Sequence, residues 1–198
     1  MNHDRLSNAI ELIDRANAED PHHEVWQGQA HPKEWLYARH MSRWLEKLDP
    51  APSEARQLAA RGQHIRRWTV PREDYPEGRE GYLRWRKFLY RFHAEQVASI
   101  MAEVGYDGDT IAAVKRMVGK EGIKRDDDVQ LIEDVACLVF LEQYFPAFAK
   151  KYDEDKLVDI VRKTWKKMSE AGHHAALALD LPEDLKPLVA KALQSPGD

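Results

Sequence analysis

The sequence predicts an all-α protein with about seven to eight helices in a single domain. Apolar residues recur three, four and seven positions apart through almost the whole chain, and no segment of alternating β-branched residues interrupts this pattern. Glycine, proline and aspartate signals separate the periodic segments. A chain of 198 residues can bury a core of its own. We therefore expect one domain over residues 1–198, with 170–198 as a C-terminal extension packed on it.

Each periodic segment predicts one helix, and the residues between segments mark where the helices begin and end. The run from Asp49 to Ser53 contains two prolines and predicts the end of one helix and the N-cap of the next. Gly105 is expected to end the longest helix, and Asp107 or Asp109 to cap its successor. The predicted helices lie near residues 4–18, 33–48, 53–68, 79–104, 108–120, 127–145, 154–170 and 182–194.

Residues 69–81 contain two prolines and two glycines, which predict a loop. This loop joins the predicted helix that carries His64 to the one that carries His93. It also contains arginine and tyrosine, which loops often use for binding. We therefore expect it to form a flap over whatever the two histidines face.

Composition restricts the compartment and the class of protein. No apolar stretch approaches the roughly 20 residues of a membrane span, and the first 20 residues are charged and amphipathic, unlike a signal peptide. The single cysteine, Cys137, lies in an apolar run and is expected to be a packed thiol in a reducing compartment. The sequence thus predicts a soluble cytoplasmic protein with no membrane partner and an unknown oligomeric state.

Charge is distributed unevenly along the chain. The net charge is -4, yet residues 61–91 hold nine Lys or Arg against four Asp or Glu, so that stretch is +5 and the remainder is -9. A local basic patch on an acidic protein favours an anionic ligand held at one place over a general nucleic-acid surface.

Two apolar helix rows contain ionisable residues. The row from Tyr82 to Val104 places Arg86 and His93 among apolar neighbours, and a second row places Asp134 between Leu131 and Leu138. Burying an ionised carboxylate without a partner costs several kcal/mol. Asp134 should therefore have a cation, a metal ion or a dense set of hydrogen-bond donors beside it.

Four side chains form a candidate metal site: His40, His64, His93 and Asp134. Imidazole nitrogen and carboxylate oxygen together suit iron, manganese, zinc or nickel. The spacing is not a local motif, so the site requires four helices to converge. Without metal, His40 could be a buried neutral histidine, His64 could lie beside a solvated cationic face, and His93 could form a buried ion pair with Asp134.

A run rich in arginine and aromatic residues extends from His64 to Arg86. Guanidinium groups hold phosphate through paired N–H donors, and tryptophan or tyrosine rings can stack on a base, so the run predicts a nucleotide-sized pocket. Two lysines in a glycine-bearing turn could extend it, although a plain helix connector is an alternative. The candidate phosphate ligands are Arg67, Arg72, Arg79, Arg86, Lys120 and Lys124, whereas Arg84, Lys87 and Arg91 are expected to face solvent.

The common sequence-readable catalytic motifs are absent. The chain has no glycine-rich phosphate loop, nucleophile elbow, CxxC pair or HExxH helix. Serine or cysteine nucleophiles are therefore not expected. The residues best support attack of a metal-bound water on phosphorus, with arginines stabilising the developing charge.

Several distinctive strings resemble a bacterial and fungal family that is catalogued only as a domain of unknown function. They cover nearly the whole chain and imply no activity. The strings are His64-Ile-Arg-Arg-Trp-Thr-Val-Pro-Arg, Tyr75-Pro, Gly81-Tyr-Leu-Arg-Trp-Arg, Phe92-His-Ala-Glu and Glu133-Asp-Val-Ala-Cys-Leu-Val-Phe-Leu-Glu.

More distantly, the arrangement is similar to the HD-domain superfamily of helical metal-dependent phosphohydrolases, which have a histidine, a His-Asp doublet and a late aspartate. The similarity implies an HD-like bundle in which His40, His64 and Asp134 occupy those places and His93 matches the extra histidine of two-metal members. The sequence departs from this pattern at the His-Asp doublet, where Ile65 replaces the metal-binding aspartate.

Two functions follow as expectations. The first is an HD-like metal-dependent phosphohydrolase that acts on a phosphorylated small molecule such as a nucleotide, with His64, His93 and Asp134 as catalytic residues and His40 as a further ligand. The alternative is a non-catalytic module that keeps the fold without metal and binds an anion, a nucleotide or RNA. Ile65 favours this alternative.

Overall fold

The computed structural model describes residues 2–194, and the chain divides into two compact units, Met1–Gly122 and Ile123–Asp198. The single domain over residues 1–198 stays a prediction. The all-α class is confirmed. The described residues form ten α-helices, more than the seven to eight predicted, and one two-stranded sheet. No helix among them combines the length and apolar character needed to cross a bilayer.

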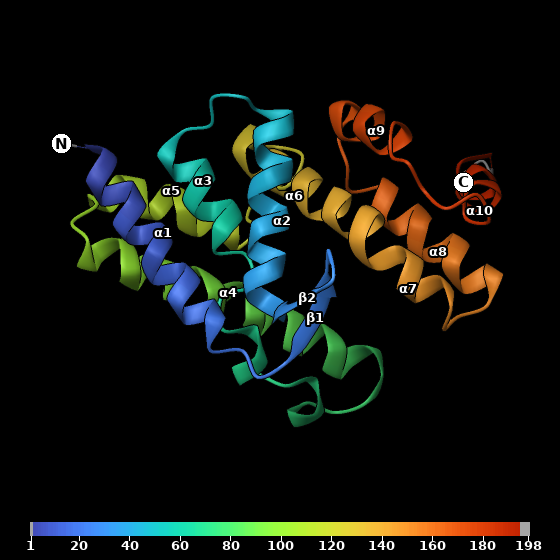
Figure 1. Ribbon diagram of the computed structural model, residues 1–198, viewed down its shortest axis with the longest axis horizontal. Coiled ribbons are helices and arrows are strands. Elements are labelled where there is room, and N and C mark those ends of the chain that lie inside the picture. The colour runs from blue at the N-terminus through green and yellow to red at the C-terminus, as the bar shows by residue number, and fades with distance from the viewer. Residues whose placement is uncertain (1, 195–198) are drawn as a thin grey trace. The chain divides into compact units, whose positions relative to one another are not determined.

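The first unit is a helical bundle that includes the longest helix of the chain. That helix, α4, packs against α1 and α5, while α3 packs against α1, α2 and α5 (Figure 1). The elements are α1 (Asn2–Ala18), β1 (His23–Trp26), β2 (Gln29–Pro32), α2 (Lys33–Leu48), α3 (Glu54–Arg61), the 3-10 turns η1 (Arg67–Thr69) and η2 (Arg72–Asp74), α4 (Gly78–Glu103) and α5 (Gly108–Val118). Its fully buried side chains include Ile13, Met41, Leu58, Ile65, Leu89, Val97 and Met117.

A β-hairpin that the sequence reading missed leads directly into α2. Its tight turn uses Gln27 and Gly28, both with positive φ (50° and 79°), as a type I′ turn requires. The buried carboxylate of Asp20 accepts the backbone N–H of His22 at 2.9 Å and that of Glu34 at 3.0 Å. Asp20 thereby fixes the first turn of α2 and the place of Glu34.

The third helix is shorter than predicted: it ends at Arg61, not near residue 68. Arg66 adopts a left-handed conformation (φ 52°, ψ 29°), and the side-chain oxygen of Asn17 accepts its backbone N–H at 3.2 Å. A residue in this conformation cannot continue a right-handed helix. As a result, His64 lies in a tight turn and Arg67 begins a 3-10 turn.

The predicted loop between α3 and α4 is present and is held by hydrogen bonds within it and to α4. The guanidinium of Arg72 donates to the carbonyl oxygens of Tyr75 and Pro76, each at 2.9 Å. The indole N–H of Trp85 on α4 donates to the carbonyl oxygen of Val70 at 2.9 Å. The loop is therefore anchored on the first turns of α4.

The second unit contains five α-helices among the described residues. The predicted helix over 127–145 is interrupted by a π-helical turn, and Ser169 starts a separate helix by accepting the backbone N–H of Gly172 at 3.2 Å. Within this unit, α9 packs on α6 and α10 packs on α8. The elements are α6 (Asp127–Val139), the π turn η3 (Phe140–Tyr144), α7 (Phe145–Ala149), α8 (Glu154–Trp165), α9 (Glu170–Leu177) and α10 (Lys186–Gln194), with a core that includes Phe145, Leu157, Val161 and Leu185.

Candidate functional site

Two of the predicted histidines meet inside the first unit. His93 on α4 is 2% exposed, which confirms its predicted burial, and its ring centroid lies 5.7 Å from that of His64. The side chain of His64 is 26% exposed. Its ring stacks on Tyr37 of α2 with centroids 3.9 Å apart and planes inclined by 8°. His64 is therefore both fixed by packing and partly exposed to solvent.

Both ring nitrogens of His64 have partners. Nδ1 lies 3.1 Å from Oε2 of the buried Glu34, and Nε2 lies 3.4 Å from Nη1 of Arg67. A guanidinium can only donate, so we assign Nε2 as an acceptor and place the ring hydrogen on Nδ1, which donates to Glu34. The lone pair of Nε2 consequently faces Arg67.

Three cationic side chains from separate segments act electrostatically on these imidazoles: Arg67 from η1, Arg86 from α4 and Lys120 from the turn after α5. The Arg86 guanidinium donates to the Tyr90 hydroxyl at 2.5 Å, and the Lys120 ammonium lies 5.8 Å from the centre of the same ring. Arg67 lies over the Trp85 ring at 4.7 Å. Arg67, Arg86 and Lys120 are called the cationic cluster below.

The cluster changes the protonation of the groups on which it acts. Burial lowers the pKa of His64 and of His93 well below the ordinary value, and the charge of Arg67 lowers both further, followed by those of Lys120 and Arg86. Burial also raises the pKa of Glu34 to about 8, against the opposing effects of Arg67 and Lys33. At neutral pH both imidazoles are uncharged, and the site carries a net positive charge.

Backbone strain accompanies the cationic cluster. Arg66, directly before Arg67, and Lys120 itself have φ values of 52° and 58°. A left-handed conformation costs a non-glycine residue on the order of 1–2 kcal/mol and tends to occur at functional sites. Two strained positions therefore present two of the three cations.

The remaining predicted phosphate and metal ligands of the first unit lie in other surroundings. Arg72 donates to loop carbonyls, and Arg79 is exposed on the first turn of α4. His40 is buried with its ring edge-on to Trp26, at 5.4 Å between centroids and 87° between planes. Lys124 belongs to the second unit and is exposed. The predicted roles of these four residues in binding phosphate or a metal ion stay predictions.

Asp134 also belongs to the second unit. It is 3% exposed, as its position in an apolar helix row predicted. Its Oδ1 accepts hydrogen bonds from the Gln130 side chain at 2.9 Å and the Ser169 backbone at 2.8 Å, and its Oδ2 accepts from the Ser169 hydroxyl at 2.5 Å. This is the dense set of donors that its burial requires, and it places a carboxylate at the N-terminus of α9. Among residues 2–194, no group of three or more His, Cys, Asp or Glu is arranged to hold a metal ion.

Sequence reasoning missed Glu34 and Tyr37, which hold His64 in place. A signal was available, because Glu34 and Tyr37 share one helical row with Met41 and Leu45, and an acidic residue in an apolar row is the feature that revealed Asp134. The expectation that Arg84, Lys87 and Arg91 face solvent is confirmed.

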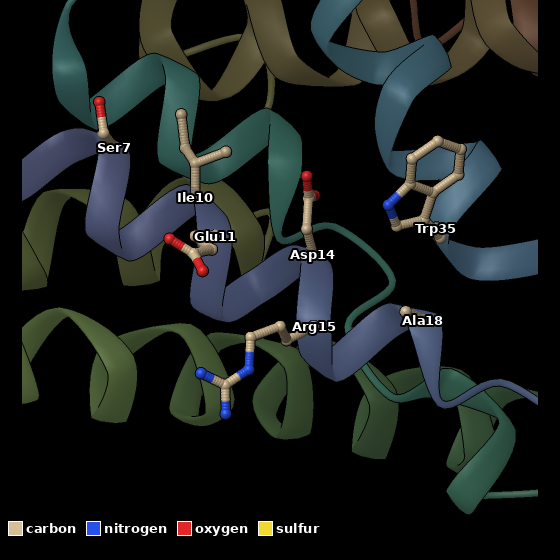
Figure 2. A pocket seen from close by; sticks show the side chains of 7 residues that line it. All are labelled: Ser7, Ile10, Glu11, Asp14, Arg15, Ala18 and Trp35. Carbon is tan, nitrogen blue, oxygen red and sulfur yellow. The ribbon is translucent and has the colours of Figure 1, made fainter.

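The cationic cluster is distinct from a hollow on the surface of the same unit. Figure 2 shows this hollow beside α1, with Trp35 of α2 across it. Asp14 in its wall forms a bidentate pair with the buried Arg61, with both N–O distances 2.6 Å, so that its carboxylate is engaged in the fold. The lining residues are Ser7, Ile10, Glu11, Asp14, Arg15, Ala18 and Trp35.

Fold and site together describe a helical protein with two neutral imidazoles beneath a cationic cluster. The chain matches the family model "Domain of unknown function (DUF4202)" over residues 7–189, and it belongs to this family. This confirms the resemblance to a family of unknown function. No curated protein and no solved structure matches the chain.

Proposed function

We propose that residues 1–122 bind a phosphorylated small molecule whose phosphate lies in the cationic cluster. One observation carries the proposal: Arg67, Arg86 and Lys120 come from three separate segments, and Arg67 lies against His64 while Arg86 and Lys120 lie at the same Tyr90 ring. Guanidinium and ammonium groups are the donors that proteins use for phosphate oxygens. A bound phosphate would also offset the repulsion among the three cations, so the site is complementary to a dianion.

A nucleotide is the class of ligand that the neighbouring residues favour. Tyr82 on α4 is 44% exposed, and its ring centre lies 5.9 Å from the guanidinium carbon of Arg86. Aromatic side chains beside phosphate-binding arginines provide a surface on which a base can stack. A phosphate on Arg86 would place the attached nucleoside near Tyr82.

A divalent ion fits this donor set poorly. The cationic cluster repels a metal ion at the two imidazoles, and Nδ1 of His64 is already bound to Glu34. Ile65, in the place of the metal-binding aspartate of the HD pattern, is fully buried in the core. The oxygens of Asp134 accept hydrogen bonds from its own unit. The proposal therefore involves no step through a metal, and the HD similarity remains an expectation from the sequence.

Calorimetric titration with inorganic pyrophosphate and with adenosine diphosphate tests this proposal. We expect the separate variants Arg86→Gln and Lys120→Gln each to weaken binding of both ligands at least about fivefold, because each loses a charge-assisted hydrogen bond. Arg84→Gln is the matched control, since it removes the same charge from an exposed position on the same helix. It should change the affinity by less than about twofold.

Two results would contradict the proposal. One is the absence of binding of either ligand to the wild type. The other is an equal loss of affinity in Arg84→Gln, together with a steep dependence on salt concentration, which would indicate a diffuse polyanion surface of the kind that RNA uses.

A further inference from the structure

The geometry points to His64 as a nucleophile: we propose that the first unit transfers a phosphoryl group from a phosphate monoester to Nε2 of His64 and then to water. This inference rests on the proposed function, because the cationic cluster must hold the phosphate. It goes beyond binding, because it assigns a reaction and a covalent intermediate to the site.

The orientation of the His64 ring carries the inference. Nδ1 is held by Glu34 at 3.1 Å and the ring face by Tyr37 at 3.9 Å, so that Nε2 is directed at Arg67 Nη1, 3.4 Å away. A phosphate oxygen bound to that Nη1 would take the place of Nε2 as acceptor and bring phosphorus next to the lone pair. Holding the reacting atoms in this way removes much of the entropic barrier.

The groups around Nε2 of His64 suit phosphoryl transfer. The cationic cluster can stabilise charge on the phosphoryl oxygens during the reaction. Nε2 of His93 is buried and has no hydrogen-bond partner among the described residues. A buried polar atom without a partner is costly, and in the tautomer that carries the ring hydrogen on Nε2, His93 would donate to a phosphoryl oxygen at this point.

The reaction balances in two steps. In the first, the lone pair of His64 Nε2 forms an N–P bond while the P–O bond to the ester oxygen breaks, and the leaving oxygen keeps that electron pair and takes a proton from solvent. In the second, water attacks phosphorus, the N–P bond breaks with its electron pair returning to Nε2, and inorganic phosphate leaves. No oxidant or reductant is involved.

Rapid-quench mass spectrometry with p-nitrophenyl phosphate tests the proposal on the full chain at pH 8 with EDTA present. This ester is a suitable probe because its leaving group needs no protein acid. We expect one phosphoryl group per chain within the first turnover, stable in alkali and labile in acid. The adduct should fall at least about tenfold in His64→Gln. It should change less than about twofold in His23→Gln, which removes an exposed histidine of the same unit.

Glu34 is a positioning residue in this scheme, and its test is rescue by the conservative variant. Glu34→Gln keeps an oxygen that accepts from Nδ1 of His64 and should form the adduct. In Glu34→Ala, the amount of adduct should fall at least about tenfold. Circular dichroism at the assay temperature establishes that each variant is folded.

Three outcomes overturn the inference: no adduct in the wild type, an adduct retained in folded His64→Gln, or an adduct that forms only in a parallel reaction without EDTA. If pyrophosphate still binds and Lys120→Gln still weakens that binding, the proposed function stands while the histidine chemistry fails. If pyrophosphate does not bind, both fail.

Discussion

The Glu34→Gln variant is expected to gain stability over the wild type as pH rises, by up to about 5 kcal/mol at pH 9 relative to pH 4. Burial raises the pKa of Glu34 from 4.5 to about 8. Between these values the unfolded chain releases the proton while the folded chain keeps it, so ionisation favours unfolding at about 1.4 kcal/mol per pH unit. The stability that protonated Glu34 contributes is complete below pH 4.5 and lost above pH 8. Glutamine does not titrate.

Urea unfolding of both proteins between pH 4 and pH 9 measures this difference. The comparison cancels the contributions of His64 and His93, which both proteins share. Glu46→Gln is the matched control, because it removes a carboxylate from an exposed position of the same helix. A parallel pH dependence in Glu34→Gln and the wild type would show that Glu34 is not a buried acid.

Replacing Arg67 by glutamine is expected to weaken pyrophosphate binding by about 10- to 100-fold and to raise the pKa of both imidazoles. The first effect follows from the loss of a guanidinium that provides charge-assisted hydrogen bonds worth about 1.5–3 kcal/mol. The second follows because Arg67 contributes the largest charge effect at His64 and at His93. No other single residue is expected to change both properties so strongly.

Proton NMR titration of the imidazole Cε1–H signals, combined with calorimetry, measures both effects of Arg67→Gln. Arg84→Gln provides the comparison, since it lacks the contact with the Trp85 ring and with His64 that Arg67 makes. Unchanged histidine pKa values in Arg67→Gln would show that the guanidinium does not face these rings.

Much of the fold was predictable because local signals agree with tertiary packing. The capping signals at Ser53 and Asp107 are confirmed, since each side chain accepts a backbone N–H of its own helix. The buried state of His93 and Asp134 followed from helical periodicity, and that of Cys137 from the apolar run in which it lies.

The parts that sequence reasoning missed depend on distant contacts. The early end of α3 requires Asn17, 49 positions away in the chain from Arg66, to hold that residue in a left-handed conformation. Tertiary structure also decides whether a polar residue in an apolar helix row receives hydrogen bonds from its neighbours or faces a ligand. Asp134 is satisfied by Ser169 and Gln130, whereas Nε2 of His93 has no hydrogen-bond partner among the described residues.

A crystal structure with tungstate would test most directly whether the cationic cluster is a phosphate site. Tungstate has the shape and charge of phosphate, and its anomalous scattering locates it without ambiguity. We predict an anomalous peak within hydrogen-bond distance of Arg67, Arg86 and Lys120, next to Nε2 of His64. Tungstate bound only at other positions, with these side chains left in their present contacts, would contradict the account.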